Sequence, residues 1–152
     1  MAKESNTAIE LTISPASLED VEAIVQIDAE VTGEKKTDFW YGRYVQQKED
    51  SSVTLLVGRN QGQVIGFVLG SIKAWEFGSY PCGWVEAITV SPHHRKGLVA
   101  SRLFDAAVAN FHNSGITTIR TMVHIDAHEL ISFFRMQGMM AGPYIELEMQ
   151  TD

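Results

Sequence analysis

The spacing of hydrophobic residues predicts one long amphipathic helix near the middle of the chain. Apolar side chains recur there at intervals of three and four residues, with Arg102, Asp105, Asn110 and His112 on the other face. Asn113-Ser114-Gly115 is typical of a helix end. The apolar positions are Ala100, Leu103, Phe104, Ala107, Val108 and Phe111.

β-rich runs lie on both sides of this helix. Ile9 to Ser14 alternates, and two further runs flank Asn60-Gln61-Gly62, which is a hairpin signal. The run "GWVEAITV" ends at Pro92, and "TTIRTMVHI" and "YIELEM" follow the helix. We expect each run to be a strand.

Three further helices are expected. Ser17 caps the first, whose apolar face is Leu18, Val21, Ile24 and Val25. Asp38 begins the second, which we expect to be short and interrupted at Gly42. Asp126 and Glu129 have the spacing of a capping box that opens a helix from 127 to 137, ended by Gly138.

The order of these elements is β, α, α, three β, α, β, α, β. This order predicts a mixed α/β sheet with at least one parallel crossover, through the helix after Pro92. A length of 152 residues predicts a single domain, 1–152, with a core from about 9 to 149.

Composition narrows the function classes. A single cysteine, Cys82, excludes an internal disulfide framework and makes a reducing cytoplasm the expected compartment. The first ten residues do not resemble a secretory signal, and the longest apolar run is too short to span a bilayer. The net charge of −7 argues against nucleic acid as a partner and weakly favours a cationic or amine-bearing one.

The stretch "VEAITVSPHHRKGLVASRLFDAA" combines a strand, a turn and a helix start. Backbone N–H groups at a helix start, together with the helix dipole, form an anion site. Arg95 and Lys96 add positive charge, and Gly97 permits close approach of a ligand. The stretch contains neither a P-loop nor a dinucleotide-binding fingerprint, and a plain solvated turn is the alternative.

The same stretch resembles the GNAT family of N-acetyltransferases. In that family a strand ending in Val-x-Pro is followed by a pyrophosphate loop, [QR]-x-x-G-x-[GA], that opens a long helix. Val90, Pro92, Arg95 and Ala100 stand at the matching places, whereas Leu98 stands where the family has its middle glycine. The resemblance runs from about Ile9 to Met149 and implies a mixed, mostly antiparallel sheet flanked by helices.

The resemblance implies acetyl-CoA as co-substrate, without a metal. Within the segment Ile88, Thr89 and Val90, the backbone groups of Ile88 and Val90 would pair with the pantetheine arm of the coenzyme. A backbone N–H near Ile88 would polarise the acetyl carbonyl. The pyrophosphate would be held by the N–H groups of Arg95, Lys96, Gly97, Leu98, Val99, Ala100 and Ser101.

Glu86 is the candidate general base. It lies four residues before Val90 in an otherwise apolar strand, where several members of the family carry a catalytic carboxylate. A carboxylate in such a strand is costly unless it is solvated, paired or used. The alternative is therefore a solvated edge position.

The family's usual acid, a tyrosine of the last helix, is missing. With Gly138 fixing the register, Phe134 occupies the tyrosine position beside the coenzyme, and Ala127 occupies that of an asparagine. Tyr144, Tyr41 and Tyr44 are alternative proton donors that the sequence does not rank, and Phe134 could also simply pack in the core.

Two other groups of residues, a histidine pair and an aromatic cluster, are better explained by structure than by a ligand site. His124 and His128 are four residues apart, but a helix start falls between them and no third metal ligand is evident. The aromatic residues Phe39, Trp40, Tyr41 and Tyr44 are more typical of a core than of an acceptor pocket.

The leading hypothesis is an N-acetyltransferase acting on a primary amine of a small molecule or protein. An acyl-CoA-binding regulatory or interaction domain is the alternative, and an unrelated nucleotide-binding domain is a third. The acceptor, the acyl-chain length and the oligomeric state stay open, although a homodimer is common in similar proteins.

Overall fold

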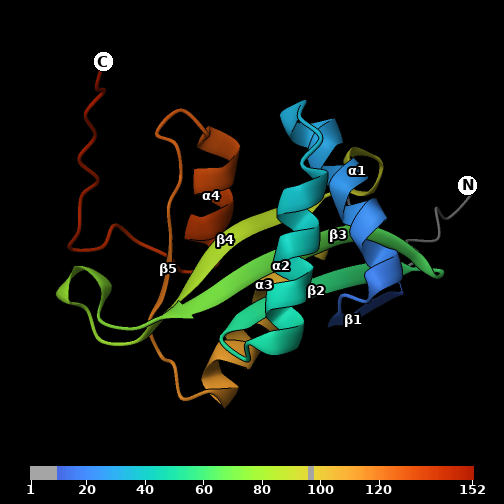
Figure 1. Ribbon diagram of the computed structural model, residues 1–152, viewed down its shortest axis with the longest axis horizontal. Helices are drawn as coiled ribbons and strands as arrows, with labels where there is room; N and C mark the ends of the chain where they lie inside the picture. Colours follow the sequence, from blue (N-terminus) through green and yellow to red (C-terminus); the bar gives the residue numbers. More distant parts are fainter. Residues whose placement is uncertain (1–9, 96–97) are drawn as a thin grey trace, which may run out of the picture. The chain divides into compact units, whose positions relative to one another are not determined.

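The computed structural model describes residues 10–95 and 98–152, which form two compact units, 10–122 and 123–152. The second unit contains α4 (His128–Met136). The first contains every other element (Figure 1): β1 (Leu11–Pro15), η1 (Leu18–Asp20), α1 (Val21–Thr32), α2 (Thr37–Glu49), β2 (Val53–Asn60), β3 (Gln63–Lys73), η2 (Glu76–Gly78), β4 (Cys82–Val90), η3 (Pro92–His94), α3 (Val99–Asn113) and β5 (Ile119–Thr121).

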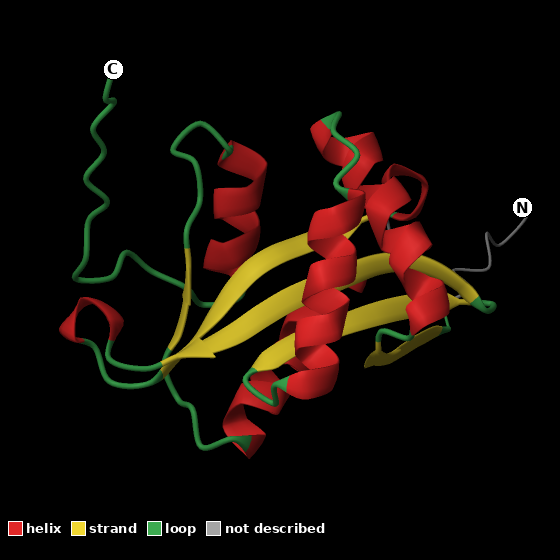
Figure 2. Cartoon of the chain, viewed as in Figure 1, coloured by secondary structure: helices red, strands yellow, loops and turns green. Residues whose placement is uncertain are grey.

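The strands of the first unit form one sheet in the order β1-β2-β3-β4-β5 (Figure 2). The first three pairings are antiparallel, and β4 pairs with β5 in parallel through the crossover helix α3. The expected mixed, mostly antiparallel sheet and its crossover are therefore confirmed. The hairpin is also confirmed, because Gln61 and Gly62 both have positive φ, as a two-residue turn between twisted strands requires.

Helices α1 and α2 cover one face of the sheet (Figure 1). Trp40 is the largest side chain of this core, and its ring meets that of Phe67 edge-on, with centroids 4.9 Å apart. Tyr41 and Tyr44 pack against the same core. Most of the aromatic group on α2 is therefore core, while Phe39 is exposed with Arg43 over its ring.

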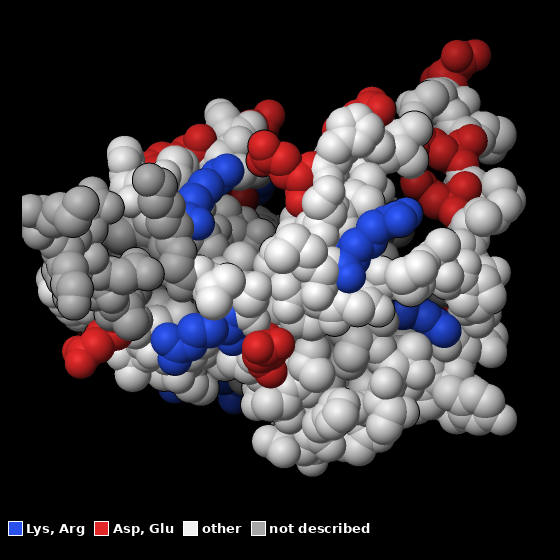
Figure 3. Space-filling view, turned by 180° about the vertical axis from the view of Figure 1, so that it is seen from behind, with Lys and Arg blue, Asp and Glu red and all other residues white. Residues whose placement is uncertain are grey.

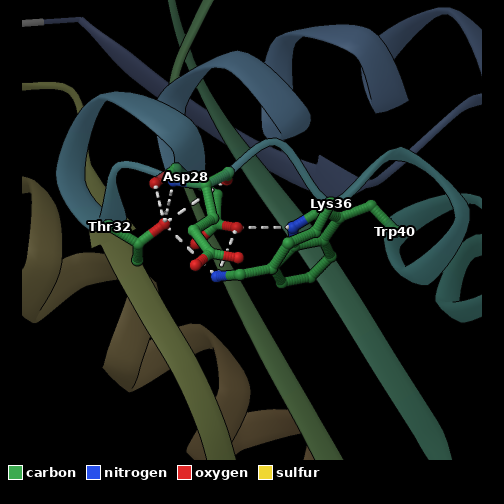
Figure 4. Close-up of polar contacts among 5 residues, drawn as sticks. Asp28, Thr32, Lys36 and Trp40 are labelled. Carbon is green, nitrogen blue, oxygen red and sulfur yellow. Dashed lines mark hydrogen bonds and ion pairs between the residues drawn. The ribbon is translucent and has the colours of Figure 1, made fainter.

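A buried carboxylate fastens α2 to α1 (Figure 4). The Asp28 carboxylate accepts hydrogen bonds from Trp40 Nε1 and Lys36 Nζ, each at 3.0 Å. Thr32 Oγ1 donates to the Asp28 carbonyl oxygen at 2.8 Å and accepts from Lys36 Nζ at 3.3 Å. These bonds hold the loop between the two helices.

Helix α3 covers the opposite face and approaches the strands closely at glycines. A Cβ on Gly83 or on Gly70 would lie 2.7 Å from atoms of the Phe111 ring. Real Cβ atoms essentially never come so close, so the Phe111 ring can occupy this position because neither glycine has a side chain.

Four expectations about elements are corrected. Helix α2 continues through Gly42, because burial of Trp40 outweighs the roughly 1 kcal/mol propensity cost of one glycine. The strand expected over "TTIRTMVHI" is limited to β5. Asp126 does not cap α4: Ala127 is the N-cap and forms no side-chain cap bond. The segment 144–149 is not a strand, because it takes part in no ladder of the described residues.

The described surface carries both signs of charge. Lys and Arg side chains are interspersed with Asp and Glu on the face seen in Figure 3.

Within residues 10–95 and 98–152, no helix is both long enough and apolar enough to span a bilayer.

A second buried carboxylate ties the start of α1 to β2. Arg59 donates from Nη1 to Asp20 Oδ1 at 2.6 Å and from Nη2 to Oδ2, and the Ser17 N–H donates to Oδ2 at 2.8 Å. Burial alone raises the pKa of Asp20, but the hydrogen bonds from Arg59 and Ser17 outweigh it. The pKa therefore lies below its ordinary value.

We predict that Asp20→Asn lowers the free energy of unfolding at neutral pH by about 2–4 kcal/mol, because Arg59 loses its charged partner. The native pKa is lowered, so the contribution is full above about pH 4 and declines as the pH falls through the native pKa. Urea unfolding over that range should show the gap to wild type narrowing in acid. Asp105→Asn, at an exposed position of α3, is the control. A gap that does not change with pH would contradict the prediction.

Candidate functional site

A β-bulge in β4 places Glu86 outside the regular pairing with β3. Leu69 pairs with Ala87, whereas the next residue, Gly70, pairs with Val85. Glu86 is therefore an extra residue in β4, and a bulge of this kind re-aims the backbone that follows it.

Hydrogen bonds on both sides of the bulge show which way the backbone groups point. Before it, the Gly83 N–H donates to Thr118 O at 2.9 Å and Thr121 Oγ1 donates to Val85 O at 2.8 Å, so both residues face β5. After it, the Ser91 N–H donates to Ile65 O of β3 at 2.7 Å.

Antiparallel ladders alternate between residues that exchange hydrogen bonds and residues that do not. Counting back from Ser91, Thr89 and Ala87 bond to β3. The N–H and C=O groups of Ile88 and Val90 therefore point to the outer edge.

The outer edge of β4 is open beyond the bulge. Strand β5 pairs with β4 from Gly83 to Val85 and ends at Thr121. From Glu86 to Val90, no described strand pairs with this edge. The backbone groups of Ile88 and Val90 are thus available to an extended ligand that carries amides.

The open edge leads directly to the start of α3. Pro92–His94 forms a short 3₁₀ turn, Arg95 is exposed, and Leu98 is the N-cap of α3. Val99 is buried and Ala100 is half-buried in the first turn, where N–H groups lack intrahelical acceptors, and Ser101 follows, also half-buried. Lys96 and Gly97 lie outside the described residues.

Glu86 faces a lysine of the neighbouring strand. Lys73 Nζ lies 3.5 Å from Glu86 Oε1, and the Glu86 side chain is 20% exposed. The carboxylate is therefore paired with Lys73, at a residue that is exposed when its backbone and side chain are taken together.

A family model of acetyltransferases, described as the GNAT family, matches residues 21–139. The chain belongs to the GNAT family. No curated protein sequence matches it significantly.

Solved structures of N-acetyltransferases share the fold at low sequence identity. An aminoglycoside antibiotic 6'-N-acetyltransferase from Acinetobacter haemolyticus has a TM-score of 0.76 and 19% identity, covering 93% of this chain and 99% of that one. A ribosomal-protein-alanine N-acetyltransferase from Brucella melitensis biovar Abortus 2308 has a TM-score of 0.73 and 17% identity, covering 93% of this chain and 99% of that one. An N-acetyltransferase from Thermoplasma acidophilum in complex with coenzyme A has a TM-score of 0.69 and 17% identity, covering 85% of this chain and 89% of that one.

Leu98, which stands where the GNAT pattern has a glycine, adopts a backbone conformation that favours glycine. Its φ of 63° and ψ of 21° lie in the left-handed region, which the family's glycine would adopt without strain. Its side chain points away from the core, because the residue is 73% exposed. Its N–H therefore lies at the start of α3, on a residue whose side chain is in solvent.

Phe134 belongs to the second unit. It is buried in α4 and contacts Phe133 edge-on, with ring centroids 5.2 Å apart. Its position beside the coenzyme stays a prediction. Of the alternative donors, Tyr41 and Tyr44 are half-buried in the first unit and Tyr144 is exposed in the second.

The histidines of the second unit are exposed. His124 Nδ1 accepts the Asp126 N–H at 3.1 Å, and α4 begins at His128. In the described part of the chain, no three His, Cys, Asp or Glu side chains are grouped to hold a metal ion.

Sequence reasoning missed Lys73 and Thr121. Lys73 reaches Glu86 because the register of the antiparallel pairing places β3 beside β4. Thr121 donates a hydrogen bond to Val85 O, the last β4 carbonyl with a partner on this side before the edge opens. In the sequence, Lys73 could have been noticed as an ionisable residue at the end of an otherwise apolar strand.

We predict that Leu98→Gly leaves the free energy of unfolding within about 1 kcal/mol of wild type. Relief of the left-handed strain offsets the added flexibility of glycine, at about 1 kcal/mol each. Leu18→Gly is the matched control, because Leu18 is also exposed but lies in a 3₁₀ helix. Chemical denaturation should show a larger loss for Leu18→Gly, and equal losses would mean that Leu98 is not strained.

Proposed function

We propose that the chain transfers the acetyl group of acetyl-CoA to a primary amine by direct attack. The observation that carries the proposal is the open edge of β4 from Glu86 to Val90, which leads into the start of α3. Membership of the GNAT family and the coenzyme A complexes of structural neighbours support it.

The first unit fits the extended coenzyme. Amides of the pantetheine arm would pair with the outward groups of Ile88 and Val90, as an added strand does. The pyrophosphate would be held by backbone N–H groups between Arg95 and Ser101, with the dipole of the fifteen-residue helix α3 favouring its charge.

The reaction centre would lie at the bulge. A backbone N–H near Ile88 would polarise the acetyl carbonyl, which becomes negative in the transition state. The attacking amine must be neutral, so a proton has to leave it. Glu86 would take that proton directly or through a water, because its carboxylate lies at the point where the edge opens.

The thiolate of coenzyme A would leave without an acid at position 134. Phe134 has no proton to give. A free thiol has a pKa of about 8.5, so the thiolate is a tolerable leaving group that water can protonate.

The acceptor class is a primary amine of a small molecule or of a protein. Structural neighbours are an aminoglycoside and a ribosomal-protein-alanine N-acetyltransferase, and the net charge of −7 favours cationic acceptors. The alternative, an acyl-CoA-binding domain without turnover, is motivated by Leu98 and Phe134. It predicts coenzyme binding with no thiol release over a panel of amines.

We predict that acetyl-CoA stabilises the chain by about 2.7 kcal/mol at a concentration one hundred times its Kd. Pantetheine alone should stabilise it less, because it lacks the pyrophosphate. Differential scanning fluorimetry and calorimetry measure both. Absence of heat and of a Tm shift at millimolar acetyl-CoA would remove the basis of the proposed function.

We predict that Glu86→Gln lowers turnover about 10²-fold or more with little change in coenzyme affinity, since a general base acts on the amine. Raising the pH should partly rescue the variant, because a deprotonated amine needs no base. Glu49→Gln, an exposed change on α2, is the control. The measurement is thiol release over an amine panel, and an unaltered rate for Glu86→Gln would assign Glu86 a structural role.

A further inference from the structure

Lys73 holds a primary amine beside the candidate base. Its Nζ lies 3.5 Å from Glu86 Oε1, and its side chain is 39% exposed. Alternation along β3 places Lys73 on the same face as Phe67 and Leu69, which is the face covered by α1 and α2.

Glu86 at the bulge is also where an acceptor amine would lose its proton under the proposed function. Lys73 Nζ is the amine that the structure places against this carboxylate. A lysine of moderate exposure on a flexible four-carbon stem is a suitable nucleophile once it is deprotonated.

We propose that Lys73 is a self-acetylation site, so that the chain transfers the acetyl group of its own bound acetyl-CoA to Lys73 Nζ. This inference rests on the proposed function, because it uses the same thioester and the same base.

The step balances without a further reagent. Lys73 Nζ gives one proton to Glu86 and attacks the acetyl carbonyl. The new bond joins Nζ to the acetyl carbon, and the bond from that carbon to the coenzyme sulfur breaks. The sulfur leaves as a thiolate, the attacking nitrogen gives its second proton to that thiolate through water, and Glu86 returns the first proton to solvent.

Acetylation would change the electrostatics of the site. The amide is neutral, so it no longer forms an ion pair with Glu86. The carboxylate is then open to the ammonium group of an external acceptor, which would otherwise compete with Lys73.

The chain provides a matched internal control. Lys36 is also ion-paired with a carboxylate, that of Asp28 (Figure 4), at 3.0 Å. Its side chain is 38% exposed. Spontaneous acetylation by a thioester depends on how exposed the amine is, and the two side chains are almost equally exposed, so it should modify both lysines at similar rates. Lys36 lies in the loop between α1 and α2 and not on the strand beside the bulge.

The experiment follows acetylation of the purified full chain in acetyl-CoA by peptide mass spectrometry. We expect Lys73 to gain one acetyl group at least about 10²-fold faster than Lys36, as a general base contributes. The rate should be independent of protein concentration. Glu86→Gln should reduce the Lys73 rate to that of Lys36, and Glu49→Gln should not.

Lys73→Arg tests whether Lys73 Nζ is the nitrogen that accepts the acetyl group. It keeps the positive charge opposite Glu86 but has no acceptor amine, so the acetyl group should disappear from that peptide while circular dichroism stays unchanged.

The inference is overturned by equal rates at Lys73 and Lys36, by a Lys73 rate that rises with protein concentration, or by a Lys73 rate that survives Glu86→Gln. Thiol release to free amines with Lys73 unmodified would refute self-acetylation and leave the proposed function standing. Absence of acetyl-CoA binding in calorimetry would refute both.

Discussion

Antiparallel strands alternate the direction of their backbone polar groups, and Glu86 interrupts that alternation in β4. If Glu86 took part in the regular alternation, Ala87 and Thr89 would face the outer edge. With Glu86 as a bulge residue, Ile88 and Val90 face outward, and the side chain of Ala87 packs on the core under α1 and α2. The same residue that breaks the ladder therefore sets the edge to which a coenzyme could pair and carries the carboxylate at its start.

The remainder of the first unit keeps this edge in place. Ser91 bonds back to β3 immediately before the turn, so the end of β4 cannot swing away from the sheet. Helix α3 then begins at Leu98 and is seated on the sheet through Phe111. The proposed path from Glu86 to the helix start thus depends on β3, β4, α3 and the short strand β5, all within residues 10–122.

The sequence predicted what depends on local pattern. The period of α3, the Gln61-Gly62 turn and the break at Pro92 need no knowledge of neighbours, and each lies where it was expected. The bulge was not predictable, because an extra residue is defined only by its partner strand. Lys73 meets Glu86 for the same reason, through the register of a hairpin.

The wrong expectations have a similar origin. Gly42 favoured a helix break, but burial of Trp40 on the sheet outweighed the local cost. The segment 144–149 has the alternation of a strand, yet a strand exists only where another strand completes its hydrogen bonds. Local propensity is therefore a good guide to α3 and a poor one to elements whose stability comes from distant contacts.

The seat of Phe111 has a consequence for how such a sequence can diverge. Gly70 and Gly83 lie on two neighbouring strands, and both leave room for one aromatic ring. A methyl group at either position and a full ring at position 111 exclude each other, so the three positions are free to drift only together. Descendants with alanine at 70 or 83 should carry a smaller side chain at 111, so paired changes at these positions would report the contact between α3 and the sheet.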